Sequence, residues 1–129
     1  MHNKPLKECS IVIKGAGEMA TGVACSLYRA ILRKILLLEI PSPLAVRRAV
    51  SFCEAVHDAS MKVEGIEAVL ISGIDGIDTV WNEGNIPLLI DPNGSSVSKL
   101  KPDVFVDATI AKRNLGVSIS DARLVIALG

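Results

Sequence analysis

The sequence has few aromatic residues, no net charge and no long apolar run. Only 3% of its 129 residues are aromatic although half are hydrophobic, so the core must be built from aliphatic side chains. This composition suits strands that are covered by helices on both faces. Fourteen basic residues balance fourteen acidic ones, which argues against binding to nucleic acid or to an anionic membrane. No segment reaches the roughly 18 apolar residues of a membrane span, and no signal sequence is recognisable.

The sequence also lacks paired cysteines. Cys9, Cys25 and Cys53 are widely spaced, without a CxxC pair, so we expect neither a disulfide framework nor a metal site. Three reduced thiols are typical of a cytoplasmic protein. Cys25 and Cys53 lie in apolar helical patterns, which predicts that they are inert core residues.

Segments typical of strands and of helices alternate along the chain. A β-branched run at 10–14 precedes a helical stripe that starts at Met19, with Thr21 on its polar side. The apolar positions of this stripe are Ala20, Val23, Ala24, Leu27 and Ile31. Further strands are predicted at 35–40, 86–91, 103–110 and 123–129, together with a hairpin or meander within 61–71.

Two more helices are expected. One spans 43–56, with Pro43 at or near its start. The other follows Asp75 or Asp78, either of which would cap its N-terminus. The alternative for these two carboxylates is a shared metal ion.

The order of these elements predicts an α/β fold. A strand, a helix and a second strand, followed by further buried strands, are typical of a Rossmann-like domain with a mostly parallel sheet and helices on both faces. We expect one domain over 1–129, with 1–9 as a flexible N-terminal segment. Because the last predicted strand ends at Gly129 with no helix after it, we expect a truncated domain that belongs to a longer chain.

A glycine pattern lies between the first strand and the first helix. Gly15, Gly17 and Ala20 match G-x-G-x-x-A, in which the glycines allow a tight turn and a close approach to phosphate. The free N–H groups and the positive end of the helix dipole would face that phosphate. Glu39 lies 22 residues beyond Gly17, where a carboxylate would bind the hydroxyls of an adenosine ribose. The alternative is a tight turn that binds nothing.

Three charged residues bear on this interpretation. Glu18 brings a negative charge close to the expected pyrophosphate, although an acid in the first turn of a helix is itself stabilised by about 0.3–1 kcal/mol. Arg47 and Arg48 follow Glu39 by eight and nine residues and could bind a 2′-phosphate or another anion. Two solvated charges on a helix are the alternative for the arginines.

A second group of polar residues follows a later strand. Asp107 ends a buried run, and Lys112, Arg113 and Asn114 come shortly after it. In an open parallel sheet, ligands bind outside the carboxyl ends of the strands, so this group would share an edge with Gly15. It could fix a phosphate, a carboxylate or a pterin-like ring; ordinary surface charges are the alternative.

Four stretches together resemble the YqeB family of accessory proteins for selenium-dependent molybdenum hydroxylases, which is related to the Rossmann-like domain of the XdhC maturation factors. They are "IVIKGAGEMATGVACSLYRA", "LLLEIPSPLAVRRAVSFCEAV", "PLLIDP" and "KPDVFVDATIAKRNLG". The resemblance covers nearly the whole chain from Ser10. It implies a Rossmann-like fold and a role in maturing or inserting a molybdenum cofactor, with a hydroxylase as partner. It transfers no catalytic residue to this chain.

Three functions follow as expectations. The first is a maturation factor that binds a nucleotide, a dinucleotide such as NAD, or a molybdopterin-type cofactor. The second is an NAD-dependent oxidoreductase, for which the sequence offers no evident proton donor or base. The third is a nucleotide-sensing module without chemistry. In each of them the partner is a small molecule, with neither nucleic acid nor membrane, and homo-oligomerisation is left open.

Overall fold

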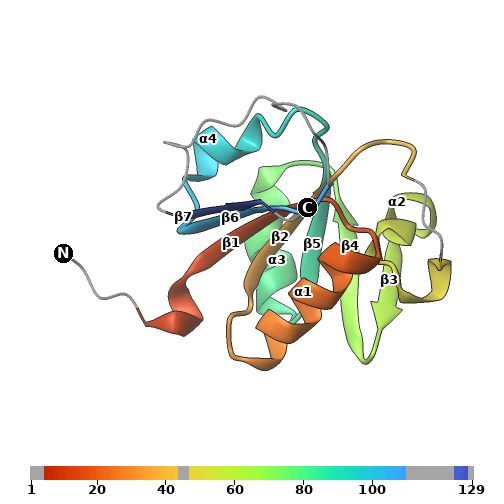
Figure 1. Cartoon of the computed structure of the whole chain (residues 1–129), viewed down its shortest axis with the longest axis horizontal. Coiled ribbons are helices and arrows are strands. Elements are labelled where there is room, and N and C mark those ends of the chain that lie inside the picture. Colours follow the sequence, from red (N-terminus) through yellow and green to blue (C-terminus); the bar gives the residue numbers. More distant parts are fainter. Residues whose placement is uncertain (1–4, 44–46, 110–123, 128–129) are drawn as a thin grey trace.

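One seven-stranded sheet forms the centre of the molecule in the computed structural model, which describes residues 5–43, 47–109 and 124–127. The strand order is β3-β4-β5-β2-β1-β6-β7. All neighbouring strands are parallel except β3 and β4, which form an antiparallel hairpin (Figure 1). The strands are β1 (Ser10–Lys14), β2 (Lys34–Glu39), β3 (Ser60–Val63), β4 (Ile66–Ile71), β5 (Ile86–Ile90), β6 (Val104–Asp107) and β7 (Leu124–Ala127). The predicted α/β Rossmann-like fold is confirmed.

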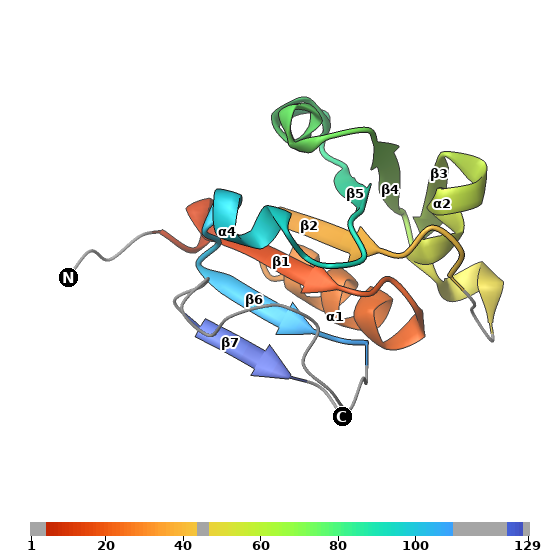
Figure 2. The same cartoon turned by 90° about the horizontal axis from the view of Figure 1, so that it is seen from above.

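Helices cover both faces of this sheet. Figure 2 shows α1 on one side of β1 and α4 on the other. The helices are α1 (Glu18–Arg29), α2 (Ala55–Asp58), α3 (Ile77–Asn82) and α4 (Ser96–Leu100), with short 3-10 turns η1 (Leu6–Glu8), η2 (Arg48–Val50), η3 (Phe52–Glu54) and η4 (Ile74–Gly76). None of the helices in the described ranges could span a lipid bilayer.

The core consists of two layers, one on each face of the sheet. Ile11 and Ile13 of β1 belong to the layer that contains α1 and η3. Val12 between them belongs to the layer that contains α3 and α4. This alternation follows from the two-residue period of a strand, which sends successive side chains to opposite faces.

The strand order reverses between β1 and β6, and the carboxyl ends of these two strands lie at that point. From β1 the chain builds β2, β4 and β5 on one side, and it then returns to place β6 on the other side of β1. Lys14 at the end of β1 pairs in register with Asp107 on β6 and with Leu38 on β2. In open α/β sheets a ligand binds in the crevice at such a point.

The first helix is shorter than predicted, and one of its side chains faces the other way. α1 ends at Arg29, and Ile31 lies beyond it in a left-handed conformation with 59% of its surface exposed. Thr21, predicted on the polar side, is buried. Its hydroxyl donates to the Ala16 carbonyl and accepts from the Phe52 amide, so these two protein groups take the place of hydrogen bonds to water.

The continuous helix predicted over 43–56 was wrong. Residues 44–46 lie outside the described part of the chain, and the rest forms η2, η3 and the start of α2, with Arg47 and Ser51 extended. The amides of Phe52 and Cys53 donate to Thr21 and Ala16 instead of to a preceding turn. These tertiary hydrogen bonds override the helical pattern.

The predicted aspartate caps were also wrong. α3 begins at Ile77 with Gly76 at its N-cap, and no side chain caps it. Asp75 lies within η4 and Asp78 within the first turn of α3. The 3-10 turn continues directly into the helix, so the N-cap residue Gly76 is helical rather than extended, and it has no side chain to cap the helix.

Candidate functional site

Gly15 makes the turn that leads out of β1. Its φ of +104° lies where residues with a side chain are strained. A Cβ there would lie 3.4 Å from the backbone of Ala108, and the Gly15 amide donates to the Leu38 carbonyl at 2.7 Å. The glycine therefore lets the loop lie directly against the chain that follows β6.

Gly17 has a different environment. Its φ of −73° is open to any residue, and a Cβ added there would meet nothing within 4 Å. Neither the turn nor the packing requires glycine at this position. The space in front of its Cα is what a ligand would need to approach the backbone, which is the role predicted for the second glycine.

The peptide groups on either side of Ala16 are fixed by hydrogen bonds from three directions. The Ala16 amide donates to Glu39 Oε1 at 2.8 Å. Its carbonyl accepts from the Cys53 amide at 2.8 Å and from the Thr21 hydroxyl at 3.2 Å. The other oxygen of Glu39, Oε2, accepts from the Ile40 amide at 2.8 Å. Glu39 thus holds the loop, and its binding to a ribose remains a prediction.

The start of α1 lies next in the chain and has donors available. Thr21 makes the first helical hydrogen bond, to Gly17 at 2.9 Å. The amides of Glu18, Met19 and Ala20 therefore have no acceptor within the helix, and no side chain caps it. Backbone donors and the positive end of the helix dipole together favour an anion here.

Glu18 and Arg47 form an ion pair beside this helix end. Glu18 Oε2 accepts from Arg47 Nε at 2.8 Å, and Oε1 accepts from the Arg47 amide at 2.9 Å. These hydrogen bonds, chiefly the one from the Arg47 side chain, lower the pKa of Glu18. The pair places Arg47 beside the start of α1, and its binding to an anion remains a prediction. The positive charge of Arg47 also balances the negative charge of Glu18, which was the argument against a phosphate at this helix end.

The structure separates Arg48 from this group. Its Nε donates to Glu54 at 3.0 Å, and Glu54 is buried. Asp107 lies on the predicted edge, where its Oδ1 accepts from the Thr109 amide at 3.0 Å and from the Thr109 hydroxyl at 2.6 Å. The predicted residues Lys112, Arg113 and Asn114 lie outside the described residues.

Lys14 and Asp91 belong to this edge and were missed in the sequence. Both line a cavity of about 20 Å³ at the carboxyl ends of the strands, together with Gly15, Leu38, Glu39, Ile40, Pro92 and Thr109. This volume holds roughly one water molecule, so a larger ligand would lie over the edge rather than inside it. The signal for Lys14 was a lysine at the end of an apolar strand, immediately before the glycine loop.

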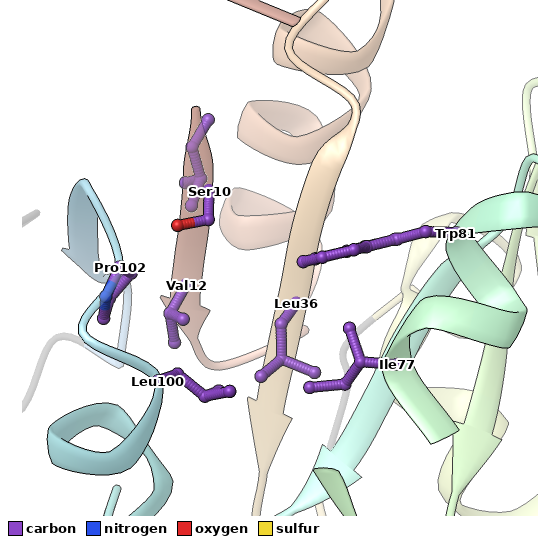
Figure 3. Close-up of a pocket in the computed structure, with 8 residues that line it drawn as sticks. Ser10, Val12, Leu36, Ile77, Trp81, Leu100 and Pro102 are labelled. Carbon is purple, nitrogen blue, oxygen red and sulfur yellow. The ribbon is translucent and has the colours of Figure 1, made fainter. Parts of the chain in front are cut away.

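A larger cavity lies away from the loop, between α3 and α4. It measures about 180 Å³ and is lined by Ser10, Ile11, Val12, Leu36, Ile77, Trp81, Leu100 and Pro102. Figure 3 shows Trp81 and Ile77 on one side of it and Leu100 and Pro102 on the other. Its lining carries no charged side chain, so it offers nothing to fix a phosphate.

Comparison with known proteins gives one curated relative. The chain is 42% identical over 119 residues to "Uncharacterized protein YqeB" of Escherichia coli (strain K12). The match covers 92% of this chain but 22% of the relative, so the chain spans about a fifth of that protein's length. No protein-family model and no solved structure matches. This chain is therefore similar to one segment of the YqeB protein, whose name assigns no function.

Proposed function

We propose that the protein binds a nucleotide or pterin-type cofactor at the carboxyl edge of its sheet, as part of an accessory factor that matures a selenium-dependent molybdenum hydroxylase. The phosphate of the ligand would accept hydrogen bonds from the first-turn amides of α1. The rest of the ligand would extend over the ends of β1, β2 and β6.

One observation carries the binding proposal. The uncapped start of α1 and the open space at Gly17 lie together at the point where the strand order reverses. Both features fit a phosphate group, because backbone donors can reach it and no Cβ blocks it. Arg47 adds a guanidinium that could move from Glu18 to the ligand.

The hydroxylase part of the proposal has a different support. It rests on the family resemblance of the stretches around Gly15, Arg47 and Lys112, and on the identity to the YqeB protein. The expected partner is the hydroxylase that receives the cofactor.

Binding is tested with the full-length protein in a thermal-shift screen against ADP, NAD⁺, GTP and a reduced pterin. A ligand at 100 times its Kd should stabilise the protein by roughly 2.7 kcal/mol. Gly17→Val should abolish that shift while the melting temperature without ligand stays close to that of the wild type. If no compound shifts the melting temperature, the binding proposal fails.

The accessory role is tested in an organism that carries both genes. Deleting the gene of the full-length protein should leave the hydroxylase present but without its cofactor, measured by activity and by metal content. Normal hydroxylase activity in the deletion strain would refute this role without touching the binding site.

A further inference from the structure

The cavity between α3 and α4 exists because these helices are too short to cover the strands beneath them. They have six and five residues and are therefore about 9 and 7.5 Å long, whereas the five-residue strand β1 is about 17 Å long. Val12 and Leu36 are register partners on β1 and β2, and they form the floor of the cavity. Ser10, at the amino end of β1, also lines it. The cavity is thus separate from the glycine loop at the other end of this strand.

An aromatic wall of this cavity is fixed in position. The Trp81 indole N–H donates to the Ile35 carbonyl at 2.9 Å, and Lys34 Nζ lies over the ring, 5.9 Å from its centroid. Both contacts come from β2. Figure 3 shows the ring extending from α3 toward β2. A second aromatic ring packs favourably against such a wall, either offset or edge-on, and a wall already held in place costs little to order on binding.

The lining of the cavity offers little to water. A buried water usually makes about three hydrogen bonds. Among the described side chains that line the cavity, only those of Ser10 and Trp81 carry a polar atom, and the indole N–H of Trp81 is already bonded to Ile35. An apolar cavity of about 150 Å³ in a protein core stays dry and binds benzene. The present cavity, at about 180 Å³, therefore has the size and the lining for one aromatic ring.

Ser10 adds a hydroxyl on the cavity side of β1. It lies on the same face as Val12, because side chains two positions apart share a face of a strand. The hydroxyl donates to Asp103 Oδ2 at 3.5 Å and accepts from the Asp103 amide at 3.3 Å, and both bonds are long. The Ser10 backbone makes shorter bonds to the same groups, since its amide donates to Oδ2 at 2.9 Å and its carbonyl accepts from the Asp103 amide at 3.0 Å. The hydroxyl can therefore turn to a ligand while the backbone keeps Asp103 in place.

We infer that this cavity binds a small neutral phenol. The ring of the ligand packs against Trp81 and over Val12 and Leu36, and its hydroxyl forms a hydrogen bond with Ser10 Oγ. The ligand is neutral because no charged side chain lines the cavity to offset the cost of taking a charge out of water. The site is independent of the proposed nucleotide site.

Calorimetry of the full-length protein with phenol and with benzene tests this inference. Both compounds should bind, and phenol should bind roughly threefold to tenfold more tightly, which is the usual effect of one neutral hydrogen bond. Ser10→Ala should reduce the affinity for phenol to that for benzene and leave benzene unchanged. This variant keeps the backbone bonds between Ser10 and Asp103.

A second variant fills the cavity with a ring of the protein's own. Leu100→Phe should abolish the binding of both compounds and raise the melting temperature without ligand, as cavity-filling substitutions commonly do. Leu6→Phe is the matched control. Leu6 is 63% exposed and lines a different apolar groove, together with residues of α1, β6 and β7, so this variant should bind both compounds like the wild type.

Three results would overturn the inference. The first is a wild type that binds neither compound, and the second is equal affinity of the wild type for phenol and benzene. The third is binding that is lost in Leu6→Phe but kept in Leu100→Phe, which would place the ligand in the other groove. If Leu100→Phe does not fold, the comparison of phenol and benzene in wild type and Ser10→Ala decides alone. Each result leaves the proposed nucleotide site untouched.

Discussion

Glu39 Oε1 accepts a hydrogen bond of 2.8 Å from the Ala16 amide, across 23 residues of sequence. This bond connects the end of β2 to the loop after β1, so the loop is held in shape by the residue expected to bind a ribose. A carboxylate oxygen can accept more than one hydrogen bond, and Glu39 can bind a hydroxyl while it keeps Ala16. The shape of the loop and the predicted contact with a ribose therefore depend on the same side chain.

Replacing this carboxylate should destabilise the fold. Ala16 is completely buried, so Glu39→Ala leaves its amide without an acceptor and should cost about 1–3 kcal/mol. Glu39→Gln keeps a carbonyl oxygen for Ala16 and should cost less. Urea unfolding of the two variants measures the difference. An alanine variant as stable as wild type would show that the bond contributes nothing.

The two loop glycines should respond differently to alanine. At Gly15 the positive φ strains any side chain, and the Cβ meets the Ala108 backbone at 3.4 Å, so Gly15→Ala should lose roughly 1–3 kcal/mol. At Gly17 neither constraint applies, and the same substitution should leave stability nearly unchanged. Thermal melts of both variants give the comparison. Equal losses would contradict the assignment of the turn to Gly15 alone.

The three thiols should differ in reactivity. Burial raises the pKa of Cys53 to about 11 and also raises that of Cys25, whereas Cys9 is only half-buried. The reactive form of a thiol is the thiolate. Because pH 8 lies three units below the pKa of Cys53, only roughly 0.1% of this residue is thiolate at that pH. Ellman's reagent should label Cys9 first in the native protein and all three thiols together in urea. Three equally fast native thiols would refute the buried positions.

The sequence predicted the sheet well, because its strands carry their own signal. Aliphatic runs marked the strands, and the strand–helix–strand start implied parallel pairing of β1 with β2. The glycine pattern correctly located the turn at Gly15, since that geometry is local.

What the sequence could not show were the contacts made across the fold. Phe52 and Cys53 donate to residues more than 30 positions away, and these bonds replace the predicted helix. The carboxylates that favour the charged form of the buried Lys14 are Asp107 at the end of β6 and Asp91 just after β5, which are far from it in sequence. Glu39 matched the position expected of a ribose ligand, but its bond to Ala16 follows only from the approach of the end of β2 to the loop after β1.

The ion pair of Glu18 and Arg47 should make stability depend on pH in one direction. The hydrogen bonds from Arg47 lower the pKa of Glu18 below its ordinary 4.5, so the folded protein favours the charged form. Its contribution is complete above the ordinary pKa and disappears as pH falls through the lowered one. Glu18→Gln should therefore melt below wild type at pH 7, and the gap should narrow progressively below pH 4.5. Arg47→Gln, which removes the same side-chain bond from its other end, should give a matching profile. A difference in melting temperature that stays constant from pH 7 to pH 3 would mean that the charges of the pair do not stabilise the fold. The ion pair would then not explain why Arg47 lies at the start of α1.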